Sequence, residues 1–161
     1  MRPARSINRV IAGAAFSSLV LAPAVAQQRH DHRHHYHSHA TGVVKERMEA
    51  MEAMANRIKA INQRLKANRE LEAIKVDAEA IRQLAIKVPA MFPPDSTSHP
   101  SEAKAAIWQK WPDFEAKARA LVEQSGKLEA TDSRDAKAMI AQTRTVSRTC
   151  GACHELYRAK R

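Results

Sequence analysis

Aromatic residues and cysteines are scarce in this sequence. Phe, Trp and Tyr make up 4% of the 161 residues, and only two cysteines are present. Two cysteines exclude a small secreted scaffold held together by many disulfides. No stretch shows the period-two alternation of apolar and polar residues that is typical of strands. The absences therefore favour an all-α protein whose core depends little on aromatic side chains.

A long apolar run is also missing, although residues 1–26 have the pattern of a secretory signal. A basic start is followed by a mostly apolar stretch and by the small-x-small sequence Ala24-Val25-Ala26. A membrane anchor is the alternative, but Ser17, Ser18 and Pro23 interrupt the stretch, which is shorter than the roughly 20 residues that a bilayer requires. We expect cleavage after Ala26, export to the periplasm and no stable membrane span in the mature chain.

The 135 residues that remain are enough for one domain with a single core. Residues 27–42 form a leader with six histidines between positions 30 and 39 and almost nothing apolar, so we expect it to be disordered. Closely spaced imidazoles could bind nickel, copper or zinc, and a leader without function is the alternative. Cleavage lowers the formal charge from +10 to about +7. The cations are scattered among acids, which predicts an acidic protein partner and no nucleic acid.

From residue 43 to residue 161 the pattern is helical. Apolar residues recur at spacings of three and four in four segments, which cover 44–65, 71–88, 101–128 and 132–157. We expect Pro89 to end the second segment and Ser101 to cap the third. Four amphipathic helices bury their apolar stripes together in a bundle. The predicted fold is an all-α antiparallel four-helix bundle with covalently bound haem, for the reason given next.

The chemistry lies in Cys150-Gly151-Ala152-Cys153-His154. Cysteine thiols add to the two vinyl groups of haem, and the histidine that follows offers a nitrogen to the iron. On a helix these three side chains lie within about one turn on one face, so all of them can reach one porphyrin. A thioredoxin-like redox pair would need a βαβ setting, and a zinc site would need more ligands. One covalent haem c is therefore the predicted cofactor, and its apolar surface would explain the shortage of aromatics.

The pattern resembles the cytochrome c′ family, the class II c-type cytochromes. The resemblance covers about residues 43–161 and rests on Cys-x-x-Cys-His-x-x-Tyr-Arg from Cys150 to Arg158, Ile107-Trp108, Phe114 and Arg47. It implies that His154 is one axial ligand of the iron. It also implies that the residue four places after Arg47, which is Met51, faces the other side of the iron. Trp108 and Phe114 are expected in the core or the haem wall.

Met51 decides between two functions. Typical members have a non-ligating apolar residue there and leave an open iron that binds nitric oxide or carbon monoxide, whereas members with methionine resemble six-coordinate electron carriers. Met48, Met51 and Met54 span about 120° of the helix with Met51 in the middle, which favours Met51. Met139 lies too far along the helix of His154, and Met91 stays a candidate. Ordinary core packing is the alternative for the first-helix methionines.

Two arginines complete the candidate site. Arg47 resembles the family arginine that approaches a haem propionate, and a solvated charge on the helix face is the alternative. Arg158 lies one turn after His154; it could modulate that ligand or neutralise the helix C-terminus. No nucleophile and base are paired in the pattern, so no enzyme is predicted. We expect a periplasmic one-electron carrier, with a gas-binding cytochrome as the alternative and a homodimer as a frequent state in the family.

Overall fold

A computed structural model describes residues 40–160 of the chain. The predicted signal peptide 1–26 and the histidine-rich part of the leader lie outside the described residues. The described part contains helices and no strand, apart from one isolated bridge between Ala103 and Arg158. Its elements are α2 (Gly42–Ala67), α3 (Ala73–Lys87), the 3-10 turn η1 (Pro89–Met91), α4 (Ala106–Gln109), α5 (Trp111–Ala130) and α6 (Ala136–Tyr157).

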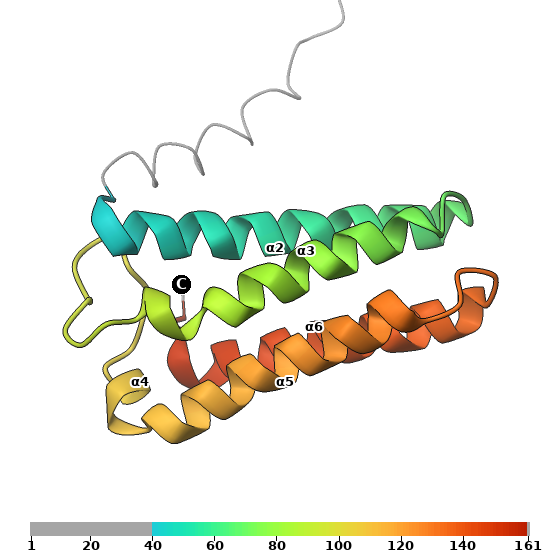
Figure 1. The fold of residues 1–161 in the computed structure, drawn as a ribbon. Helices are drawn as coiled ribbons and strands as arrows, with labels where there is room; N and C mark the ends of the chain where they lie inside the picture. Colours follow the sequence, from blue (N-terminus) through green and yellow to red (C-terminus); the bar gives the residue numbers. More distant parts are fainter. Residues whose placement is uncertain (1–39, 161) are drawn as a thin grey trace, which may run out of the picture.

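The four long helices run up and down in turn and form an antiparallel bundle, which confirms the predicted fold (Figure 1). α2 packs against α3 and α6, and α5 packs against the same two helices. Short turns join α2 to α3 and α5 to α6 at one end, and the long connection of residues 88–105 crosses the other end (Figure 1). The end with the long connection also holds the C-terminal end of α6, where the two cysteines lie.

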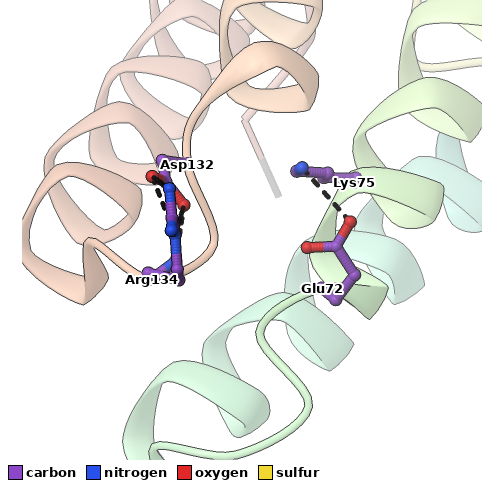
Figure 2. Close-up of polar contacts among 4 residues, drawn as sticks. All are labelled: Glu72, Lys75, Asp132 and Arg134. Carbon is purple, nitrogen blue, oxygen red and sulfur yellow. Dashed lines mark hydrogen bonds and ion pairs between the residues drawn. The ribbon is translucent and has the colours of Figure 1, made fainter.

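The helices end for local reasons. Asn68 closes α2 in the left-handed conformation, with φ of 47°, and its amide donates to the carbonyls of Arg64 and Leu65. Asp135 caps α6 and accepts a hydrogen bond from the amide of Ala138 at 2.8 Å. Figure 2 shows the charged residues of the two short turns, which lie near one another at the same end of the bundle. Each turn contains its own ion pair, Glu72 with Lys75 at 3.2 Å and Asp132 with Arg134 at 2.8 Å.

The core consists of the apolar stripes of all four helices. Fully buried members include Ile61, Ile74, Ile81, Ile107, Leu128, Met139 and Val146. One carboxylate is also buried between α2 and α3. Asp77 accepts from Arg57 at 3.0 Å and from Arg64 at 2.5 Å, so two guanidinium groups neutralise it.

The predicted start of the third helix is wrong. Ser101 does not cap it, because its hydroxyl accepts from Arg47 and from the amide of Ala103. The helix begins at Ala106 and breaks at Lys110, which has φ of −126° and ψ of 42°. Pro112 explains the break, because its ring nitrogen cannot donate to the carbonyl of the preceding turn and the ring would clash there.

The predicted stripe of the first helix is also shifted. The buried residues of α2 are Val44, Arg47, Ala50, Met54 and Ile61. Met48 and Met51 are only half-buried. Met51, although it is the middle one of the three methionines, therefore does not point into the packed core of the bundle. The reason is that the side of α2 that carries Met51 faces a cavity.

Candidate haem site

A cavity of about 360 Å³ lies at the end of the bundle where the long connection crosses. α2 contributes one wall, the C-terminal end of α6 another, and the connection closes the end. Its lining includes Met48, Met51, Phe92, Phe114, Cys153 and His154. Three segments that are distant in sequence thus enclose one largely apolar space.

The cysteine-histidine motif lies on the last turns of α6. Both cysteines are half-buried and free, so they form no disulfide with each other. Cys153 and His154 line the cavity, and Cys150 packs at the edge of the hydrophobic core. Burial raises the pKa of the Cys150 thiol and raises that of Cys153 to about 11. Both side chains are therefore protonated thiols at neutral pH.

His154 is half-buried in the cavity wall. Burial lowers the pKa of its imidazole, the nearby Arg158 lowers the pKa further, and Glu102 opposes them. The neutral imidazole, which can donate a lone pair to a metal, is therefore favoured. The structure places this nitrogen ligand on the wall of the same space as Cys153, as the motif predicts.

Met51 lines the cavity from α2. Met54 is 6% exposed and lies in the core, and Met91 and Met139 are core residues outside the cavity lining. Met48, which lies one turn before Met51, also lines the cavity. Among residues 40–160, Met48 and Met51 are thus the methionines that line the same cavity as His154. Ligation by Met51 remains a prediction.

Arg47 is 3% exposed, so the interpretation as a solvated surface charge is wrong. Its guanidinium donates to the Ser96 hydroxyl at 3.0 Å, and also to the Ser96 carbonyl and the Ser101 hydroxyl. It lies over the Phe92 ring, 4.8 Å from its centroid. Arg47 therefore ties the long connection to α2 and also lines the cavity. A propionate partner for it stays a prediction.

Arg158 follows the last residue of α6 and is exposed. Its amide donates to the carbonyl of His154 at 3.0 Å, and its side chain lies 4.0 Å from Glu102. It borders the cavity together with Glu102. Arg158 thus lies on the side of His154, as expected, but a carboxylate from the long connection accompanies it.

Sequence patterns missed the short backbone pairing that holds this carboxylate. The amide of Lys104 donates to the carbonyl of Tyr157 at 3.0 Å, and the amide of Ala159 donates to the carbonyl of Glu102 at 2.8 Å. Two hydrogen bonds thereby fix the connection against the end of α6. Three residues have no detectable period, so nothing in the sequence indicates this pairing.

Aromatic side chains form the inner wall, as predicted for Phe114. Its ring packs edge-on against Phe92 at 4.9 Å and against Tyr157 at 5.4 Å between centroids. The Trp108 indole donates to the carbonyls of Phe92 and Pro93 at 3.1 and 3.0 Å. These contacts connect α4, α5 and α6 with the long connection and stiffen the wall.

Tyr157 links this wall to a charge. Its hydroxyl donates to Asp113 at 2.5 Å. Burial and this hydrogen bond raise the pKa of Tyr157 to about 12. The phenol is therefore neutral over the whole physiological range.

The residues present fit a covalently attached haem. Two free thiols lie one helical turn apart, an imidazole follows the second thiol, and the cavity beside them has an apolar wall. Within residues 40–160, no cluster of three or more His, Cys, Asp or Glu side chains is placed to bind a bare metal ion. The donor set therefore suits a porphyrin iron better than a bare ion.

Comparison with known proteins agrees with this assignment. A model of the family described as Cytochrome C′ matches residues 42–158. The chain is 34% identical to a cytochrome c′ from Rhodospirillum rubrum over 122 residues, which cover 72% of this chain and 81% of the relative. It is 36% identical to a cytochrome c-556 from Agrobacterium tumefaciens over 92 residues, which cover 57% of this chain and 75% of the relative.

Solved structures share the fold. The cytochrome c′ from Rhodopseudomonas palustris superposes with a TM-score of 0.69 at 26% identity and covers 76% of this chain and 99% of its own. A nitric oxide complex of a cytochrome c prime mutant from Alcaligenes xylosoxidans has a TM-score of 0.66 at 28% identity and covers 74% and 94%. The chain therefore belongs to the cytochrome c′ family, whose members carry covalently bound haem c.

Proposed function

We propose that this chain is a periplasmic monohaem cytochrome that carries single electrons. In this proposal Cys150 and Cys153 would hold the haem, and His154 and Met51 would bind its iron. The observation that supports it most is that Met51 of α2 and His154 of α6 line one cavity. When bound, the haem supplies reversible one-electron chemistry between ferric and ferrous iron.

The protein's own residues shape this chemistry in three ways. The neutral imidazole of His154 offers a nitrogen, and the thioether of Met51 offers a soft sulfur that tends to raise the reduction potential. The wall of Phe92, Phe114 and Tyr157 keeps water away from the site. Arg47 holds the long connection over the cavity, and its cation favours an anionic group on the cofactor beside it.

Periplasmic location is part of the proposal. Residues 1–26 have the order of a secretory signal. Among the described residues, no helix combines the length and apolar character that crossing a membrane requires. The intact mass of the protein from a periplasmic extract should match a chain that begins at Gln27 plus one haem. A soluble holoprotein that retains Met1 would contradict export with cleavage.

The ligand prediction is tested by the Met51→Leu variant. The wild-type ferric protein should be low-spin, with a weak charge-transfer band from methionine to iron near the red end of the visible spectrum. Met51→Leu should give a high-spin, five-coordinate iron that binds carbon monoxide readily, because leucine has no lone pair to donate. Absorption and magnetic circular dichroism spectra in both oxidation states measure the change.

Two matched variants locate the effect. Met54→Leu should leave the spectrum nearly unchanged, because Met54 lies in the core and outside the cavity lining. Met48→Leu tests the neighbouring methionine of the cavity wall and should also preserve the low-spin spectrum. If Met48→Leu alone removes the charge-transfer band, the sulfur ligand is Met48, and the assignment to Met51 is wrong.

Gas binding is the second candidate. A relative in this family was solved as a nitric oxide complex, at 28% identity to this chain. Met51 is only half-buried, so a gas could displace its sulfur. A wild-type ferric protein that is already high-spin, and a ferrous protein that binds carbon monoxide at once, would favour this function over electron transfer.

We also propose that the protein can form a homodimer, as members of this family often do. Sedimentation velocity over a range of protein concentrations tests this proposal. A mass of one chain at every concentration would contradict it.

A further inference from the structure

The outer side of α6 at the cysteine motif carries small and apolar residues. Gly151, Ala152 and Leu156 are exposed there, and a methyl group added to Gly151 would meet no atom within 4 Å. Leu156 is 48% exposed and is one of three large apolar side chains among residues 40–160 that are exposed to this degree; the other two, Val76 and Ile86, lie on α3. We call Gly151, Ala152 and Leu156 the α6 patch.

The α6 patch lies directly over the proposed attachment points. Gly151 and Ala152 of the α6 patch stand between Cys150 and Cys153 in the sequence. The two cysteines point inward, since both are half-buried against the core. Gly151 and Ala152 have the smallest side chains, so only a thin layer of protein separates solvent from the two thiols. A protein that binds here would lie against the helix that carries both proposed attachment points.

Four cations surround the α6 patch. Arg148 precedes Ala152 by one turn on the same exposed side of the helix. Lys104 lies at the end of α6, where its ammonium group donates to the carbonyl of Glu155 at 3.4 Å. Arg158 and Lys160 follow the helix and are exposed. Three acids lie in this region. Glu155 is exposed on the same side of α6, Glu102 lies 4.0 Å from Arg158, and Asp113 pairs with Lys117 at 3.9 Å. The rim therefore has an excess of positive charge.

The opposite end of the bundle has no such excess. Two of its cations have an acid beside them: Lys75 pairs with Glu72, and Arg134 pairs with Asp132 (Figure 2). Arg148, by contrast, donates to the hydroxyl of Thr145. Arg148 thus places a cation that is bonded to a hydroxyl rather than to an acid beside the exposed apolar residues and the cysteine motif.

We infer that the α6 patch and its rim of Lys104, Arg148, Arg158 and Lys160 form the docking surface for an acidic redox protein. The inference rests on the proposed function as an electron carrier. Electron transfer weakens steeply with distance, so the partner must come close to the edge of the cofactor. An apolar centre with a charged rim suits a small, transient interface, and complementary charge speeds the encounter. One electron leaves the partner, which is oxidised, and reduces the ferric cytochrome; no atom or proton is transferred.

The test uses the full holoprotein and an acidic flavodoxin in its hydroquinone state as the probe. Flavodoxin hydroquinone loses one electron and becomes the semiquinone, which stopped-flow absorption follows. The second-order rate constant for the wild type should fall by at least about tenfold between low and high salt. The double variant Arg148→Glu with Lys160→Glu should lower it at least about fivefold at low salt and flatten the salt dependence.

A matched double variant controls for total charge. Lys59→Glu with Lys66→Glu makes the same change of charge on exposed positions of α2. Its rate constant should stay within about twofold of the wild type. Unchanged visible and far-ultraviolet spectra of both double variants show that fold and haem are intact.

A second measurement does not depend on electron transfer. A carbodiimide joins carboxylates directly to lysines that touch them, so crosslinks to flavodoxin mark the contact surface. Mass spectrometry should find Lys104 and Lys160 in the crosslinks and should not find Lys59 or Lys66. Reduction that is rapid but equally sensitive to both double variants, or crosslinks that map to α2, would overturn the docking surface and leave the carrier function standing. A haem that neither flavodoxin nor a small neutral reductant can cycle reversibly would overturn both.

Discussion

At the scale of single residues, neighbouring methionines on α2 have different environments. Successive steps of three residues rotate the side chain by about 300°, so Met48, Met51 and Met54 point in directions that differ by about 60° each. Met54 is therefore packed in the core, while Met48 and Met51 face the cavity. A step of three residues, which changes the direction of the side chain by about 60°, separates the packing residue Met54 from the candidate ligand Met51.

Asp77 is a buried charge that depends on a few neighbouring side chains. It is 3% exposed, and the carboxylate depends on Arg57 and Arg64 of α2 for its hydrogen bonds. Because Arg57 is half exposed, part of this interaction is screened by water. The pairing joins α2 to α3 away from the cavity.

We predict that Asp77→Ala destabilises the protein by about 2–3 kcal/mol, since it removes the buried carboxylate that accepts from Arg64 and leaves this partly buried guanidinium only Glu70, at 3.7 Å. Urea unfolding of the holoprotein, followed by circular dichroism, measures the loss. Glu79→Gln, an exposed change on the same helix, should cost less than about 0.5 kcal/mol. A loss for Asp77→Ala as small as that of the control would show that the buried ion pair contributes nothing.

At the scale of elements, the turns and breaks depend on a few side chains. Pro112 divides the third helical region into α4 and α5, and this division lets Trp108 bind the carbonyls of Phe92 and Pro93. At the far end, Arg134 folds back on Asp132 with both its side chain and its backbone amide (Figure 2). These hydrogen bonds hold the pKa of Asp132 at about 2.

The α5–α6 turn therefore has a predictable pH dependence. The pKa of Asp132 is lower in the folded protein than in the unfolded chain, so the contribution of this carboxylate to stability is complete above about pH 4. It is lost as the pH falls through about 2. Arg134→Gln should move the pKa toward the ordinary value of 3.8, because the side-chain hydrogen bonds are the largest cause of the shift.

Carbon-13 NMR of the side-chain carboxyl group follows this titration. Arg119→Gln on the exposed side of α5 removes a different ion pair, with Glu115, and should leave the Asp132 titration unchanged. An Asp132 that already titrates at its ordinary value in the wild type would contradict the role of Arg134.

At the scale of the whole molecule, the cofactor should hold the open end of the bundle together. The cavity of about 360 Å³ lies among α2, α6 and the long connection, so a haem bound there would bury surface from all three. Binding to the folded state alone raises the stability of a protein. Covalent attachment keeps that ligand in place during transient opening.

We predict that the Cys150→Ser, Cys153→Ser double variant loses covalent haem. The wild type should stain for haem peroxidase on a denaturing gel at the mass of the mature chain, and the double variant should not. Its melting temperature should fall by roughly 10 °C or more. Each single variant should keep one thioether and give a pyridine haemochrome spectrum between those of the wild type and of free haem. Haem that acidic acetone extracts from the wild type would refute attachment through these cysteines.

The sequence alone determined the helical fold and the chemistry of α6. Periods of three and four residues are local, and Cys150, Cys153 and His154 lie within one turn, so no distant contact is needed to bring them together. Only the tertiary structure decided what meets this motif. Contacts between segments far apart in the chain place Met51 opposite the motif in one cavity, bury Arg47 under the long connection and pair residues 102–104 with the end of α6. Such contacts depend on which faces pack together, and that property belongs to the assembled bundle rather than to any one helix.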